Sequence, residues 1–168
     1  MDVEAQGSVA RVRAALLAAG HPDTIAEFPE GTRTAAAAAA AVGCAVAQIA
    51  KSIVFRAGGD SRAAVIVTSG ANRVDSRRAA AALGVALVRA DADWVRAATG
   101  FAVGGVAPLG YAVGVLPPPL LLLDQDLLAL DPIWAAAGSP RHVFRTSAAA
   151  LQRLTGAVVA VVRADQPG

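Results

Sequence analysis

The sequence predicts an α/β (α+β) fold with a mixed, largely antiparallel sheet and helices packed around it. Two observations support this class. β-rich runs outnumber the helical ones, and several neighbouring runs are joined by short turns rich in Gly or Pro, which favours antiparallel pairs. A third observation concerns organisation: no repeat or long linker interrupts the 168 residues. We therefore expect one domain over residues 1–168.

The first half of the chain alternates helix signals with β-rich runs. We expect helices at Ser8–Ala19 (capped by Ser8 and closed by Gly20), from the Thr34 cap through the alanine run to Gly43, and from the Asp75 cap to Leu83 before Gly84. We expect strands at Thr24–Phe28, Ile49–Arg56, Ala63–Thr68 and Ala86–Arg89, with Gly58–Ser61 turning the central pair into a hairpin.

The second half begins with a short helix and then becomes rich in Gly and Pro. We expect helices at Asp91–Ala98 and Ser147–Thr155, and a structured loop at Phe101–Gly110 with strand at its edges. The expected strands are Tyr111–Leu116, Leu120–Asp124, a hairpin of Ile133–Ala137 and His142–Phe144 around Gly138–Pro140, and Val158–Arg163 before a frayed tail.

Composition predicts a soluble, cytoplasmic protein. Hydrophobic residues make up 55% of the chain but aromatic residues only 4%, so the core must be built from Val, Leu, Ile and Ala. The single cysteine, Cys44, allows no internal disulfide and fits a reducing compartment. The acidic start does not resemble a signal peptide, and the apolar run Tyr111–Leu123 is short and interrupted by prolines, so we expect no membrane association.

Basic residues offer two candidates for binding. Lys51 is the only lysine beside fourteen arginines, so it is either a chance survivor of compositional bias or a residue retained for its chemistry. Arg73, Arg77 and Arg78 cluster near the start of a predicted helix, where they either meet phosphates or form an ordinary solvated face. With a formal net charge of only +2, any affinity for RNA should be modest and sensitive to salt.

The sequence predicts neither a metal site nor a bound cofactor. His21 and His142 have no partner at metal-ligand spacing. Cys44 lies at a helix end without a catalytic partner, so we interpret it as a small hydrophobic residue.

Three segments carry a family resemblance. The first joins Thr34 and the alanine run to Gln48–Phe55, the second runs from Val65 to Asp75, and the third is Thr99–Gly110, which contains Gly104-x-x-x-Pro108. In order and spacing they resemble the YbaK/ProX family, which includes the editing domain inserted in bacterial prolyl-tRNA synthetases. The similarity covers Leu16–Leu154, with Ser52 where threonine is common and Val106-Ala107 in place of a more polar pair.

This resemblance implies an editing-domain fold with a partly barrel-like sheet and a trans-editing aminoacyl-tRNA deacylase. Its substrate would be the acceptor end of misacylated tRNA, specifically tRNA-Pro carrying a small amino acid such as Ala or Cys. Its protein partner would be prolyl-tRNA synthetase or an elongation factor, with no metal, no cofactor and no membrane. The residues leave open whether water or a ribose hydroxyl makes the attack.

The resemblance also assigns site residues. Lys51 would be essential for deacylation, because an ammonium can hold the ester carbonyl or the acceptor nucleotide. Gly104, Gly105 and Pro108 would form a catalytic loop whose backbone groups bind the aminoacyl moiety; the alternative is a purely structural turn. The further substrate-binding candidates are Thr34, Ser52, Val106, Ala107, Gly110, Arg73 and Asp75, although Asp75 is better explained as a helix cap.

Two other functions compete with this hypothesis. The fold could serve as a non-catalytic module that binds tRNA or nucleotides in association with a synthetase. It could also hydrolyse another small acyl ester.

Overall fold

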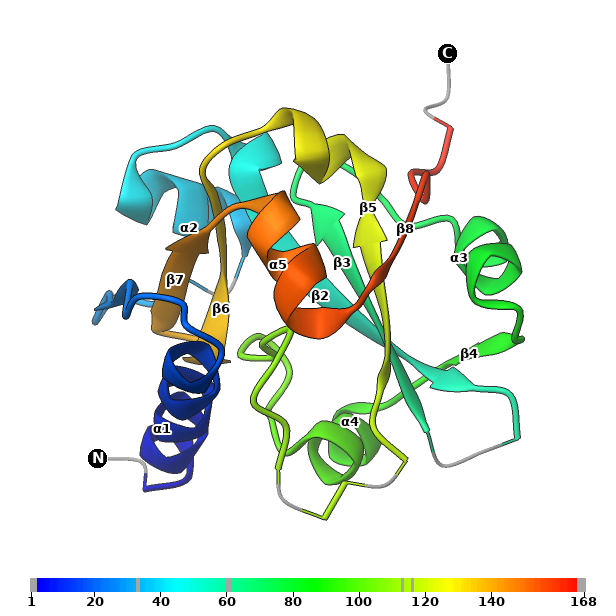
Figure 1. The fold of residues 1–168 in the computed structure, drawn as a ribbon, viewed down its shortest axis with the longest axis horizontal. Helices are drawn as coiled ribbons and strands as arrows, with labels where there is room; N and C mark the ends of the chain where they lie inside the picture. The colour runs from blue at the N-terminus through cyan, green and yellow to red at the C-terminus, as the bar shows by residue number, and fades with distance from the viewer. Residues whose placement is uncertain (1–2, 33, 60–61, 113, 116, 166–168) are drawn as a thin grey trace.

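The structure is a computed structural model that describes residues 3–32, 34–59, 62–112, 114–115 and 117–165. In this part of the chain, eight strands form one sheet in the order β1-β7-β6-β2-β3-β5-β8, and β4 pairs with β2 beside that path (Figure 1). The strands are β1 (Ile25–Glu27), β2 (Ile49–Ala57), β3 (Ala63–Ser69), β4 (Leu87–Arg89), β5 (Leu120–Asp124), β6 (Ile133–Ser139), β7 (His142–Thr146) and β8 (Val158–Ala160).

The sheet is mixed and largely antiparallel, as predicted. Among the described residues β1–β7, β7–β6, β2–β3 and β2–β4 pair antiparallel, and β6–β2, β3–β5 and β5–β8 pair parallel. The path ends at β1 and β8, which do not pair with each other, so the sheet is open and does not close into a barrel.

The helices cover both faces of this sheet (Figure 1). They are α1 (Val3–Ala18), α2 (Ala35–Val42), α3 (Ser76–Leu83), α4 (Ala92–Thr99) and α5 (Ala148–Thr155), with 3-10 turns η1 (Val46–Gln48) and η2 (Gln125–Ala129). Side chains from α1, α4 and α5 share the main core, whereas α2 and α3 pack on separate, smaller apolar clusters. No helix in the described ranges is long and apolar enough to span a bilayer.

Local capping explains where four helices begin and end. Thr34, Asp75, Asp91 and Ser147 each accept hydrogen bonds from backbone amides in the first turn of α2, α3, α4 and α5. A glycine in the left-handed conformation follows each of these helices, at Gly43, Gly84, Gly100 and Gly156. The predicted caps of α2, α3 and α4 are confirmed.

The predicted start of the first helix was wrong. Helix α1 begins at Val3, and Ser8 lies inside it with only 3% of its surface exposed. Residues 4–6 are Glu, Ala and Gln, which favour helix and extend it towards the N-terminus. The Ser8 hydroxyl donates a hydrogen bond of 3.4 Å to the Gly100 carbonyl, so a tertiary contact takes the place of the expected cap.

The segment after Gly100 differs from its prediction, which placed strand at the edges of the loop 101–110 and over 111–116. Residues 101–112, 114 and 115 form an irregular loop that contains no strand, so this prediction was wrong for them. Val113 and Leu116, also part of the predicted strand, lie outside the described residues. The loop is held by buried side chains such as Phe101 and by Arg11, which donates to the carbonyls of residues 100 and 110.

The last strand is shorter than predicted. Only Val158–Ala160 pair with β5, and Arg163 forms an isolated bridge with Val74. The predicted turn at Gly58–Ser61 and the predicted frayed tail fall partly on residues 60–61 and 166–168, which lie outside the described residues. The strands on either side of that turn do pair as the predicted hairpin.

Strand β2 places alternate side chains on opposite faces of the sheet. Ala50 and Val54 join the main core, whereas Ile49 packs with α2 and Phe55 packs with α3. Lys51 is two residues from Ile49 and four from Phe55, so its side chain lies on the same face of the sheet as theirs. This face carries α2 and α3. This alternation positions the site described next.

Candidate functional site

The middle of β2 has an open edge. Along one side β2 pairs with β3 from Ala50 to Arg56. On the other side it meets β6 only at Ile49 and Ala50, and β4 only from Phe55 to Ala57. Within the described part of the chain, residues 51–54 therefore have no strand partner on that side, and two cavities open beside them.

The first cavity has a volume of about 300 Å³ and gathers parts of the chain that are distant in sequence. Its walls come from α2, β2, β6, β7 and the loop after Gly100. Five predicted site residues line it, namely Thr34, Lys51, Ser52, Gly104 and Val106. The structure thus brings the lysine strand and the glycine loop to one cavity.

Lys51 is half-buried and lines both cavities. Burial lowers the pKa of its ammonium, and the nearby positive charge of Arg73 lowers this pKa further. Among the described residues, no Asp or Glu lines either cavity. A cation that is partly desolvated and lacks a carboxylate partner favours an anionic or strongly polar ligand.

Ser52 presents a second unsatisfied group. Its Oγ is buried and has no hydrogen-bond partner among the described residues, although Ser52 lines the first cavity. A buried hydroxyl without a partner costs free energy, on the order of 1–3 kcal/mol. A ligand in the cavity could supply the missing partner.

The glycine loop combines an exposed tip with a packed base. Gly104 is exposed and has a φ of +91°, which favours glycine. Gly105 is buried, and a Cβ there would lie 2.7 Å from the Ser139 Cα. Close packing against the β6–β7 hairpin therefore explains Gly105, while Gly104 and Val106 face the cavity.

The other loop candidates lie behind this surface. Ala107 and Pro108 are buried and do not line the cavity. Gly110 has a φ of +81°, and a Cβ there would lie 2.9 Å from the Val12 Cα on α1. The left-handed backbone and the close packing together account for this glycine, and Ala107 and Pro108 are buried within the loop.

The predicted arginine cluster separates into different environments. Arg73 is exposed and lines the second cavity with Lys51. Arg77 is exposed and lines neither cavity, whereas Arg78 donates to the Arg163 carbonyl and to the Asp165 carboxylate. Asp75 accepts hydrogen bonds from the amides of Arg77 and Arg78, which confirms it as the cap of α3.

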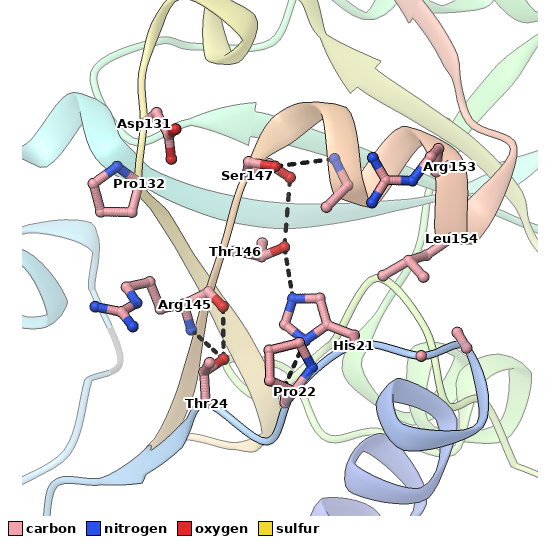
Figure 2. Close-up of a pocket in the computed structure, with 13 residues that line it drawn as sticks. His21, Pro22, Thr24, Asp131, Pro132, Arg145, Thr146, Ser147, Arg153 and Leu154 are labelled. Carbon is pink, nitrogen blue, oxygen red and sulfur yellow. Dashed lines mark hydrogen bonds between the residues drawn. The ribbon is translucent and has the colours of Figure 1, made fainter.

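Contacts within the fold account for His21 and Cys44. Groups of three or more His, Cys, Asp or Glu side chains suited to a metal ion are absent from the described residues. His21 contacts the Thr146 hydroxyl at 3.0 Å beside a third cavity of about 370 Å³ (Figure 2). Cys44 packs against the apolar cluster under α2, and burial raises its pKa.

Sequence reasoning missed two residues near the Lys51 cavities. Trp134 on β6 lines the first cavity, and Arg89 on β4 lines the second. Neither belongs to a motif in the chain. Only the pairing of Trp134 with Ile49 and of Arg89 with Phe55 brings them to β2.

The fold and this site define the class of protein. Residues 29–154, well over half of the chain, match the model of the family described as the aminoacyl-tRNA editing domain. The chain therefore belongs to that editing-domain family, of the YbaK type.

Individual proteins resemble this chain over most of its length. Uncharacterized protein YwhH from Bacillus subtilis (strain 168) is 30% identical over 115 residues, which cover 68% of this chain and 70% of that protein. A solved structure of a candidate trans-editing enzyme for prolyl-tRNA synthetase is 40% identical, with a TM-score of 0.83, and covers 98% of this chain and 99% of its own.

Two further solved structures share the fold. One comes from work on computational grafting of linear epitopes onto scaffold proteins; it is 41% identical with a TM-score of 0.84, and covers 94% of this chain and 98% of its own. The other is hypothetical protein APE2540, which is 27% identical with a TM-score of 0.82, and covers 92% of this chain and 99% of its own.

Proposed function

We propose that this protein is a trans-editing deacylase that hydrolyses the ester bond of misacylated tRNA. The observation that carries the proposal is the shared cavity of about 300 Å³, which is lined by Lys51 and by Gly104 of the loop. We further propose tRNA-Pro carrying Ala or Cys as the substrate. The 40% identity to the candidate trans-editing enzyme for prolyl-tRNA synthetase supports this choice.

In this mechanism Lys51 stabilises negative charge. Water adds to the ester carbonyl carbon and generates a tetrahedral oxyanion. If a ribose hydroxyl adds first, the acyl group moves to that oxygen, and water then attacks the new ester in the same way. The Lys51 ammonium donates a hydrogen bond to that oxyanion, and its partial burial strengthens the contact. Collapse after attack by water breaks the ester C–O bond, and the ribose oxygen takes up the proton that the water has lost as the free amino acid leaves.

The cavity walls favour a small amino acid. Val106, Trp134 and Ala136 supply apolar surface, and the unpaired Ser52 hydroxyl supplies a polar group. Discrimination by one methylene in such a pocket is worth about 1–3 kcal/mol. The α-amino group and the carbonyl would then contact the exposed backbone around Gly104.

A deacylation panel tests this proposal. The full chain is incubated with tRNA-Pro charged with alanine, cysteine, serine, threonine or proline, and ester loss is followed over time. Alanyl- or cysteinyl-tRNA should be hydrolysed while prolyl-tRNA survives. Binding of every charged tRNA without turnover would overturn the enzyme assignment and favour a non-catalytic module, and turnover of other acyl esters alone would favour a different hydrolase.

Three smaller proposals accompany this function. Residues 1–168 form one editing domain, the protein acts in the cytoplasm where its tRNA substrate is found, and its partner is prolyl-tRNA synthetase or an elongation factor. Co-purification of either protein with the full chain, in the presence and absence of tRNA, tests the last of these.

A further inference from the structure

The second cavity beside β2 is a basic pocket with an apolar floor. It has a volume of about 400 Å³ and is lined by three cations, Lys51, Arg73 and Arg89. Apolar surface comes from β2 and from Val74, and no acidic residue of the described chain lines the cavity. Lys51 and Ile53 also line the first cavity, so the two spaces lie next to each other along β2.

Strand pairing brings these cations together. Arg89 pairs with Phe55 in the β2–β4 ladder, and directly paired residues point to the same face of a sheet. Alternation along β2 places Lys51 and Ile53 on that face with Phe55. Arg73 follows β3 and reaches the same space, where its charge acts on Lys51.

The three cations of this cavity share one feature, the lack of a carboxylate partner in the described part of the chain. Among the described residues, none of the side chains of Lys51, Arg73 and Arg89 forms an ion pair with a carboxylate. Other arginines of this chain do find such partners, as Arg13 does with Asp23 at 2.8 Å. Like charges that share a cavity repel each other, and an anion between them would relieve that repulsion.

We propose that this second cavity binds the phosphodiester on the 5′ side of the terminal adenosine, in the single-stranded end of the tRNA. Arg73 and Arg89 contact the phosphate, and the apolar floor of the cavity lies against the preceding nucleotide. The aminoacylated adenosine occupies the first cavity, and Lys51 lies between the two groups. This assignment rests on the proposed function and adds to it the subsite that recognises the RNA backbone.

The chemistry favours a single-stranded phosphodiester over an isolated anion. Arginine donates two parallel hydrogen bonds to a phosphate, and an apolar wall suits a sugar or a base. The volume of about 400 Å³ exceeds what one phosphate group would fill and is suited to a nucleotide.

Two substrates that differ in phosphate content test the subsite. The alanyl ester of a tRNA-Pro minihelix carries the phosphodiester, whereas the alanyl ester of adenosine lacks it. Rates are compared for the wild-type protein, Arg73→Gln, Arg89→Gln and the double variant. The control is Arg153→Gln, which makes the same charge change at an exposed position that lines neither Lys51 cavity.

The proposal expects a selective loss. Each arginine variant should lower the ratio of kcat/KM for the minihelix to kcat/KM for the adenosine ester by roughly tenfold, because it removes a charge-assisted contact. The slope of log kcat/KM against log salt should become shallower by about 0.7 for each contact removed. The control should change neither quantity. An unchanged ratio in both variants and in the double variant would overturn the subsite.

A binding assay distinguishes failure of the phosphate subsite from failure of the proposed deacylase function. If the wild-type protein hydrolyses neither ester, the deacylase assignment fails. The subsite is then measured directly with a fluorescent ACCA oligonucleotide and with adenosine as the competitor. Weaker oligonucleotide binding by the double variant than by Arg153→Gln would still support the phosphate subsite, and equal binding would overturn it.

Discussion

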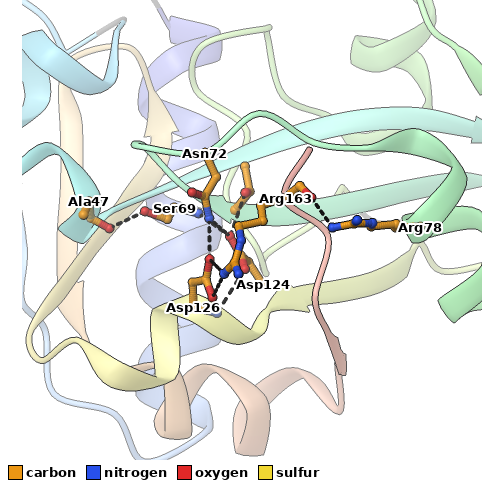
Figure 3. Close-up of polar contacts among 8 residues, drawn as sticks. Ala47, Ser69, Asn72, Arg78, Asp124, Asp126 and Arg163 are labelled. Carbon is orange, nitrogen blue, oxygen red and sulfur yellow. Dashed lines mark hydrogen bonds and ion pairs between the residues drawn. The ribbon is translucent and has the colours of Figure 1, made fainter. Parts of the chain in front are cut away.

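Two groups of charged residues in this protein differ in how their charges are satisfied. Asp124 and Asp126, at and after the end of β5, bind Asn72 and Arg163, and all four form one connected network (Figure 3). The cations of the second cavity, Lys51, Arg73 and Arg89, have no such carboxylate partners among the described residues. Charged groups that are paired within the protein stabilise the fold, whereas charged groups without a carboxylate partner are available to a ligand.

The two groups are only two strands apart. Lys51 pairs with Thr68 in the β2–β3 ladder, and the Thr68 hydroxyl donates a hydrogen bond of 2.9 Å to the Asp124 carboxylate. Asp124 is fully buried and also accepts from the amides of Ser69 and Asp126. Its carboxylate is thus occupied by neutral donors and is not available to Lys51.

Removing the lysine should produce the largest change in activity. Lys51→Ala should lower kcat/KM for alanyl-tRNA-Pro by at least about 100-fold, the typical effect of deleting one donor to an oxyanion. Rates of deacylation at several enzyme concentrations check this, with Arg153→Ala as the control. Activity within about a factor of two of the wild type would remove Lys51 from the mechanism.

Removing the buried carboxylate should instead affect stability. Asp124→Ala leaves four donors without their acceptor and should lower the free energy of unfolding by about 3 kcal/mol. Urea unfolding followed by circular dichroism measures this loss. A loss below about 0.5 kcal/mol would contradict the view that the network holds β3 and β5 together.

Removing the lysine should not destabilise the fold. Burial and Arg73 lower the pKa of Lys51, so at neutral pH the folded state bears a cost for keeping its ammonium charged. This cost is present below the lowered pKa and disappears as pH rises above the ordinary lysine value. Lys51→Met should therefore unfold at the same urea concentration as the wild type or slightly higher, and a clear fall would indicate a structural role.

The smallest expected effect concerns acid stability. The Arg163 guanidinium and Asn72 lower the pKa of Asp126, so this carboxylate contributes stability above its ordinary pKa of about 4. That contribution is lost as pH falls through the lowered pKa. Asp126→Asn should slightly reduce the free energy of unfolding at neutral pH. It should also make the fall of this free energy below about pH 4 less steep. Thermal unfolding across this range measures the effect, and parallel pH profiles for both proteins would contradict it.

The parts of the fold that were predictable are governed by short-range contacts. Thr34, Asp75 and Asp91 cap helices through hydrogen bonds that span two or three residues, so the local pattern reveals them. The prediction failed at Ser8, whose hydroxyl has a partner 92 positions away. It also failed after Gly100, where buried side chains rather than strand pairing hold an irregular backbone.

By itself, the sequence predicted the caps of α2, α3 and α4 and the main hairpins, and it pointed to the candidates Lys51 and Gly104, because these depend on local backbone conformation and on recognisable motifs. Only the tertiary structure decided that β6 and β4 each pair briefly with β2 and leave its middle open. The two cavities lie beside this open part of β2, and each places one further side chain, Trp134 or Arg89, in the same cavity as Lys51. The register between distant strands depends on packing of the whole sheet, which no local pattern encodes.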